Sequence, residues 1–86
     1  MKKIKIKDRE YWYRFESNGI YVLFEKTNYF YLVNKLIIDI LEELSRKKKI
    51  SQIISQLNKK NKTNITKQQL ISVLSNIAGV IDGITI

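Results

Sequence analysis

The strongest constraint on the fold is a change of hydrophobic pattern at Asn34. Before Asn34, short runs rich in aromatic and β-branched residues are separated by turn signals, and after it apolar residues recur at helical spacing. Ser17-Asn18-Gly19 and Lys26-Thr27-Asn28 are two such turns, where Asn and Gly tolerate positive φ. Because turns this short join antiparallel neighbours, the pattern predicts an antiparallel meander followed by helices.

The meander is predicted over residues 10–33 as three strands. Tyr11 to Glu16 and Ile20 to Glu25 have strand composition, and Tyr29 to Val33 is apolar at every position. A strand that is apolar at every position has no face that suits contact with water. Lysine alternates with isoleucine from Lys3 to Lys7, which predicts that residues 1–8 form either a basic arm or a short edge strand protected by its lysines.

Three helices are predicted over residues 34–79, and residues 80–86 form a tail that packs back. The predicted N-caps of the helices are Asn34, Ser51 and Thr66. Thr66 and Gln69 have the spacing of a capping box. The 86 residues therefore predict one α+β domain, a three-stranded antiparallel sheet followed by three helices, similar in order to a winged helix-turn-helix.

Composition argues against catalysis and against a metal or cofactor. The chain has no histidine and no cysteine, so the usual general base, the usual zinc ligand and any thiolate are missing. Asp39, Glu42 and Glu43 share a helix with basic partners and have the pattern of a solvated face. The chain has no long apolar run that could span a bilayer, and the absence of cysteine fits a reducing cytoplasm. We expect a non-catalytic cytoplasmic protein.

The charge balance has two interpretations. Sixteen Lys+Arg stand against eight Asp+Glu, a formal net charge of +8, which would attract nucleic acid, an anionic membrane surface or an acidic peptide. The chain is also rich in Lys, Ile and Asn, as AT-rich coding produces, so the charge can equally be compositional. Composition leaves both interpretations open.

DNA binding by a small transcriptional regulator is the alternative function. The third predicted helix would present amide and hydroxyl side chains to base edges, but it carries a single cation, Lys67. Most cations fall in loops and in the amino-terminal segment, where they would contact phosphates without reading sequence.

Peptide binding is the function that the third strand favours. Because Tyr29 to Val33 is apolar on both sides, both sides need cover, and an exposed strand edge accepts a guest strand through backbone hydrogen bonds. On the third helix, Ile71, Ser75 and Ala78 form a second line of small or apolar residues, which either widens the core stripe or forms the wall of a groove. The same edge would also permit self-pairing into a homodimer.

Residues 10–78 resemble the PqqD-like domain, also called the RiPP recognition element, of pathways that modify ribosomally made peptides. The stretches that carry the resemblance are "YRFESNGIYVLFEKTNYFYLVNKLIIDILEEL", "KISQIISQLNKK" and "ITKQQLISVLSNIAG". They share that family's order of an E-x-x-G hairpin, a strand ending in a hydrophobic-Asn step, a short I-x-x-L helix and a capped third helix.

The resemblance implies a specific site. In such proteins the leader of a precursor peptide docks as an antiparallel strand on the third strand, in a cleft beside the third helix. The residues so implied are Tyr29, Phe30, Tyr31, Leu32 and Val33 on the strand, with Gln68, Ile71, Ser72 and Ser75 on the helix. The family is non-catalytic and delivers the leader to a radical SAM enzyme, a cyclodehydratase or a protease. Because the chain ends near residue 86, we expect a stand-alone module whose enzyme is a separate protein.

Overall fold

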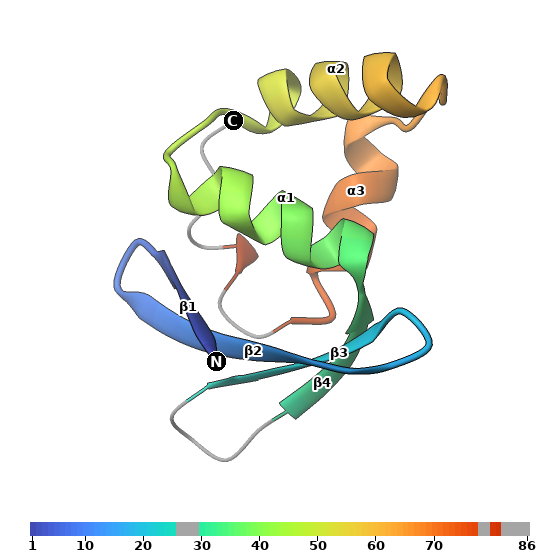
Figure 1. Cartoon of the computed structure of the whole chain (residues 1–86). Helices are drawn as coiled ribbons and strands as arrows, with labels where there is room; N and C mark the ends of the chain where they lie inside the picture. The colour runs from blue at the N-terminus through green and yellow to red at the C-terminus, as the bar shows by residue number, and fades with distance from the viewer. Residues whose placement is uncertain (26–29, 78–79, 82–86) are drawn as a thin grey trace.

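The sheet has four strands, so the prediction of a three-stranded sheet is wrong. A computed structural model describes residues 1–25, 30–77 and 80–81 of the chain (Figure 1). Within these residues four strands precede three helices, in an α+β order. The elements are β1 (Lys2–Ile6), β2 (Arg9–Ser17), β3 (Ile20–Glu25), β4 (Phe30–Asn34), α1 (Lys35–Ser45), α2 (Ile50–Asn61) and α3 (Lys67–Leu74).

The additional strand is β1, in the segment predicted as an arm or an edge strand. It pairs antiparallel with β2, and Ile4 lies opposite Tyr11. Ile4 and Ile6 are only 3% and 2% exposed and belong to the hydrophobic core. Alternation of lysine with isoleucine is therefore the pattern of a half-buried strand, with its isoleucines turned toward the helices.

The strands form a simple meander in the order β1-β2-β3-β4, which leaves β1 and β4 at the two edges. The predicted turn between β2 and β3 is confirmed, since Asn18 and Gly19 have φ values of 51° and 75°. The predicted turn at residues 26–28 and Tyr29 lie outside the described residues.

All three helices lie on one side of the sheet, and α2 lies farthest from it (Figure 1). α1 packs directly on the sheet, and α2 contacts both α1 and α3. The core between these layers is apolar and comes from every element except β4, which contributes half-buried side chains. Among the described residues no element covers the opposite side of the sheet, which we call the helix-free face. Its apolar members are Trp12, Ile20, Val22, Phe24, Phe30 and Leu32.

Two of the three predicted helix caps are confirmed. The side chain of Asn34 accepts a hydrogen bond from the Ile37 amide at 3.1 Å. Thr66 and Gln69 form a reciprocal capping box, with distances of 3.2 Å and 3.0 Å. These caps depend only on residues three positions apart, which explains why the sequence reveals them.

The predicted cap at Ser51 is wrong, because α2 begins at Ile50 with Lys49 as its N-cap. Ile50 is fully buried, so packing of this side chain sets where the helix starts. The helix then runs to Asn61, through the polar residues Asn58 to Asn61. Asn58 holds the turn that follows, because its side chain accepts from the Ile65 amide at 2.8 Å and donates to the Ile65 carbonyl at 3.0 Å.

Within the described ranges, no helix has the length and hydrophobicity required to cross a bilayer.

Candidate functional site

The outer edge of β4 is open in the part of the chain that the structure describes. β4 is hydrogen-bonded to β3, with Leu32 opposite Val22 and Phe30 opposite Phe24. No described strand pairs with its other edge. In an antiparallel sheet, half of the backbone N–H and C=O groups of an edge strand point away from the sheet. β4 therefore presents a row of hydrogen-bonding groups to a further strand.

The side chains of β4 alternate between two environments. Tyr31 and Val33 are half-buried and pack against the core beneath the helices. Phe30 and Leu32 lie on the helix-free face and are 67% and 66% exposed. The uninterrupted apolar run thus supplies the core with one set of side chains and leaves the other set without cover. Tyr29 was predicted as part of this strand and lies outside the described residues.

A buried carboxylate fixes the inner side of β4. The Tyr31 hydroxyl donates to Oε1 of Glu25 at 3.1 Å, and Nη1 of Arg9 lies 3.3 Å from Oε2 of the same residue. Glu25 is the buried charged residue of the described chain, with 9% of its surface exposed. A buried carboxylate is stable only when it is paired, so these contacts tie β4 to β3 and β2.

The predicted residues of α3 form an exposed strip with one half-buried member. Gln68, Ser72 and Ser75 are exposed, and the Ser75 hydroxyl donates to the Ser72 carbonyl at 2.7 Å. Ile71 is half-buried and packs against the core, so at this position the second line widens the core stripe. Ala78, the last member of that line, lies outside the described residues.

α3 packs chiefly on α2, whereas β4 packs on β3 and α1. Two surface hollows are lined by other elements. The larger, of about 780 Å³, lies between α1 and α2, over a floor that includes Ile40 and Ile53. The smaller, of about 460 Å³, lies beneath α1 at the ends of β1, β2 and β3. The sequence gives no signal for either hollow, because each forms between elements distant in the chain.

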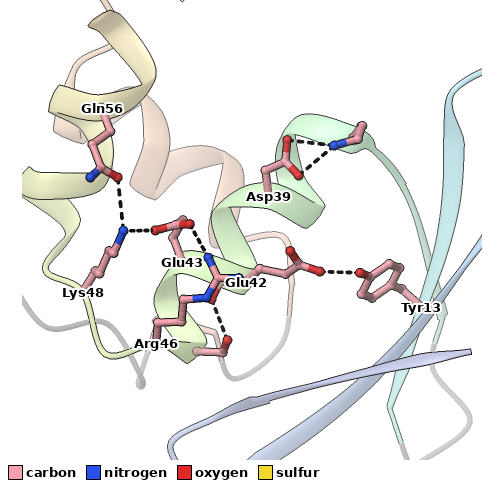
Figure 2. A network of polar contacts seen from close by, with 9 residues as sticks. Tyr13, Asp39, Glu42, Glu43, Arg46, Lys48 and Gln56 are labelled. Carbon is pink, nitrogen blue, oxygen red and sulfur yellow. Dashed lines mark hydrogen bonds and ion pairs between the residues drawn. The ribbon is translucent and has the colours of Figure 1, made fainter. Parts of the chain in front are cut away.

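An ion-pair network joins the end of α1 to α2 beside the larger hollow (Figure 2). Glu43 accepts a hydrogen bond from Arg46 at 2.7 Å, and its other oxygen forms an ion pair with the Lys48 ammonium at 2.5 Å. The Lys48 ammonium also donates to Gln56 at 3.4 Å. The hydrogen bond from Lys48, aided by Arg46, holds the pKa of Glu43 below its usual value. Both ends of this network belong to the helical layer, so we assign the network a structural role.

A second polar contact joins the sheet to α1 at the smaller hollow (Figure 2). The Tyr13 hydroxyl donates a hydrogen bond to the Glu42 carboxylate. Burial and this carboxylate together raise the pKa of Tyr13 to about 12, because both disfavour the phenolate. On the same helix Lys35 pairs with Asp39 at 3.1 Å, which raises the pKa of the lysine. These side chains hold one another and leave no free acid–base pair.

In the described part of the chain, no three carboxylate, histidine or cysteine side chains gather closely enough to hold a metal ion. Comparisons with protein-family models, with curated proteins and with solved structures find no match to this chain. We therefore identify the open edge of β4 as the candidate site from its geometry alone.

Proposed function

We propose that this protein binds a peptide segment as an added strand on the outer edge of β4 and presents it to a separate modifying enzyme. The observation that carries the proposal is the open β4 edge together with two apolar side chains, Phe30 and Leu32, each about two-thirds exposed. Strand addition supplies affinity through backbone hydrogen bonds and selectivity through alternate side chains.

The two edges of the sheet differ in how they are protected. β1 carries Lys2, Lys3 and Lys5, and lysines on an edge strand discourage pairing with another chain. β4 has the sequence FYLVN, with neither lysine nor proline within its bounds. An unprotected edge is a liability unless it is used, so the contrast favours β4 as the binding edge.

The geometry of β4 specifies which peptides fit. On the helix-free side, a guest strand places alternate residues beside Phe30 and Leu32, where apolar cross-strand pairs each contribute roughly 0.2–1 kcal/mol. On the other side, the sequence resemblance implies that guest residues reach the strip of α3 that carries Gln68, Ile71, Ser72 and Ser75. We therefore assign the guest an extended segment with apolar residues at alternate positions.

The identities of the guest and of the partner enzyme are proposed from the sequence resemblance to the RiPP recognition element of the PqqD-like family. The guest is then the leader of a ribosomally made precursor, and the partner is a radical SAM enzyme, a cyclodehydratase or a protease. The protein itself is non-catalytic, needs no cofactor and acts in the cytoplasm. Its net charge of +8 accelerates encounter with acidic leaders.

The test begins with peptides selected from a random display library on the immobilised protein. Hydrogen exchange of the complex with a selected peptide should slow at the backbone amides of β4 and remain unchanged at β1. Ser72→Glu on α3 should lower the affinity for the selected peptide at least tenfold. Ser51→Glu is the matched control, because Ser51 is also exposed and lies on α2. Protection confined to other elements, or equal affinity of the two variants, would contradict the proposal.

DNA binding, the alternative, is tested in the same assay. A labelled nonspecific duplex replaces the peptide, and affinity is measured at several salt concentrations, since phosphate contacts give a steep salt dependence. Tight, salt-sensitive binding of the duplex with no enrichment of any peptide would favour the regulator over the peptide-binding module.

A further inference from the structure

We propose that the helix-free face is the interface of a face-to-face homodimer of this chain. This inference concerns the face of the sheet rather than the outer edge of β4 and does not depend on peptide binding, although Phe30 and Leu32 belong to both surfaces. The observation that motivates it is a continuous apolar surface on three adjacent strands, which no described element covers. Six residues form it, namely Trp12, Ile20, Val22, Phe24, Phe30 and Leu32.

The register of the sheet arranges this surface in rows. Trp12 lies opposite Phe24, which lies opposite Phe30, so three aromatic residues form one row across β2, β3 and β4. The Trp12 and Phe24 rings are nearly parallel, at 18°, with centroids 6.5 Å apart. In the next row Val22 lies between Leu32 on β4 and Arg14 on β2, so this row is apolar on two of its three strands. Side chains held on paired strands form a regular apolar layer, as on the inner face of a β-sandwich.

This layer is unusually exposed for a monomer. Phe30 and Leu32 are about two-thirds exposed and Ile20 is 42% exposed, whereas Trp12, Val22 and Phe24 are half-buried. Contiguous apolar patches on soluble proteins mark interaction sites. A second sheet packed about 10 Å away would remove these side chains from water, at roughly 25 cal/mol for each Å² of apolar surface buried.

The distribution of charge identifies a second copy as the occupant. Residues 1–43, which form the sheet and most of α1, carry eight cations and seven carboxylates, a net charge of +1. Residues 44–86 carry eight cations and one carboxylate, a net charge of +7. α2, in that second half, lies at the end of the molecule away from the sheet (Figure 1). Two copies packed face to face keep these positive ends apart, so the net charge of +8 does not oppose this dimer strongly.

The rim of the helix-free face also fits a second copy better than a polyanion. Lys3 pairs with Glu10 at 3.3 Å, and Arg14 pairs with Glu16 at 3.5 Å. A rim with both signs can oppose itself across a twofold axis, as an isologous interface requires. Nucleic acid phosphates would meet two carboxylates here and would find a stronger attraction at the α2 end.

The size of the face predicts a weak dimer. Four strands spaced by about 4.8 Å, each about 17 Å long over five residues, give a footprint of roughly 330 Å² on each copy, which is smaller than a standard specific interface. We therefore expect association that depends on protein concentration. Packing of the two faces leaves the outer edges of β4 open to guest strands.

The experiment combines sedimentation velocity with fluorescence of Trp12, the chain's only tryptophan. Between about 1 μM and about 1 mM protein, the mass should rise toward a dimer while Trp12 emission shifts to shorter wavelength, because Trp12 leaves water. Leu32→Lys should weaken association at least tenfold. Phe15→Lys is the matched control, since Phe15 is 59% exposed on the helix side of the sheet and its replacement should leave the dimer intact. If circular dichroism shows that Leu32→Lys does not fold, Leu32→Ser replaces it in the experiment.

Three results would overturn the proposal. A chain that remains monomeric at the highest concentration lacks the interface. A dimer whose Trp12 emission is unchanged, or that survives both Leu32 variants, uses a different surface, such as the β4 edge. Quenching of Trp12 in a monomeric chain by oligo(dT) would assign the face to single-stranded nucleic acid, which stacks on aromatic side chains.

Discussion

Tyr31 on β4 donates a hydrogen bond to Glu25 on β3 at 3.1 Å, and Arg9 on β2 holds the other oxygen of this carboxylate. One buried acid thus links three neighbouring strands on the helix side of the sheet. The contact holds Tyr31 on the inward side of β4, and Phe30 and Leu32 remain available on the outer side. β4 offers an ordered edge because its inner side chains are held in this way.

Removal of the Tyr31 hydroxyl should weaken this arrangement. Tyr31→Phe leaves one oxygen of a buried carboxylate without its donor, which costs roughly 1–3 kcal/mol of unfolding free energy. Urea denaturation measures the loss. Tyr21→Phe is the control, because the Tyr21 hydroxyl makes no hydrogen bond that the described residues show, and this variant should change stability little. Equal stability of the two variants would mean that Glu25 is held by Arg9 alone.

The amino-terminal strand should be essential to stability. Ile4→Ala removes a side chain that is 3% exposed, and large-to-small changes in a core cost about 2–5 kcal/mol. Lys5→Ala, on the opposite side of the same strand, is the matched control and should change the unfolding free energy by less than about 0.5 kcal/mol. An Ile4 variant as stable as its control would show that β1 is dispensable.

The contact between Tyr13 and Glu42 should make stability fall at alkaline pH. The pKa of Tyr13 is about 12 in the folded chain and 10 as its ordinary value, so the folded state holds the phenolic proton more tightly. The corresponding stabilisation is complete below about pH 10 and is lost as pH rises toward 12. Tyrosinate absorbance during titration should show a late-ionising group that is missing from Tyr13→Phe.

The network around Glu43 should make stability fall at acidic pH. Because Lys48 and Arg46 lower the pKa of Glu43 in the folded state, its contribution is present above its ordinary pKa and is lost as pH falls through the folded value. Lys48→Gln should make stability less sensitive to acid, as measured by thermal unfolding between neutral and acidic pH. Lys49→Gln, exposed and one position away, is the control. An unchanged acid profile for Lys48→Gln would contradict the assignment.

The features predictable from the sequence were those set by neighbouring residues. The caps at Asn34 and Thr66 and the turn at Asn18-Gly19 depend on short-range hydrogen bonds and backbone preference, and all three are present. The start of α2 was mispredicted, because burial of Ile50 outweighs the better capping chemistry of Ser51. The position of β1 in the sheet also depends on burial of its isoleucines by elements that are distant in the sequence.

The candidate site was only partly visible in the sequence. A strand apolar on both sides indicated that β4 lacks cover, but its pattern could not show which side turns to the helices. That choice depends on Glu25, six residues away on the next strand. On α3, Val73 reads as part of the core stripe and yet is 46% exposed, because α3 ends at Leu74 and the buried residues that follow, Ile77 and Val80, lie beyond the helix.

The separation of a nearly neutral sheet half from a half with a net charge of +7 gives the molecule a large electric dipole. On a negatively charged support such as a cation-exchange resin, we expect adsorption in one preferred orientation, with α2 against the support. The sheet then points outward, and both its edge strands and its aromatic row remain in solution. Simple ionic immobilisation should therefore present the same surfaces on every molecule, without any chemical tag.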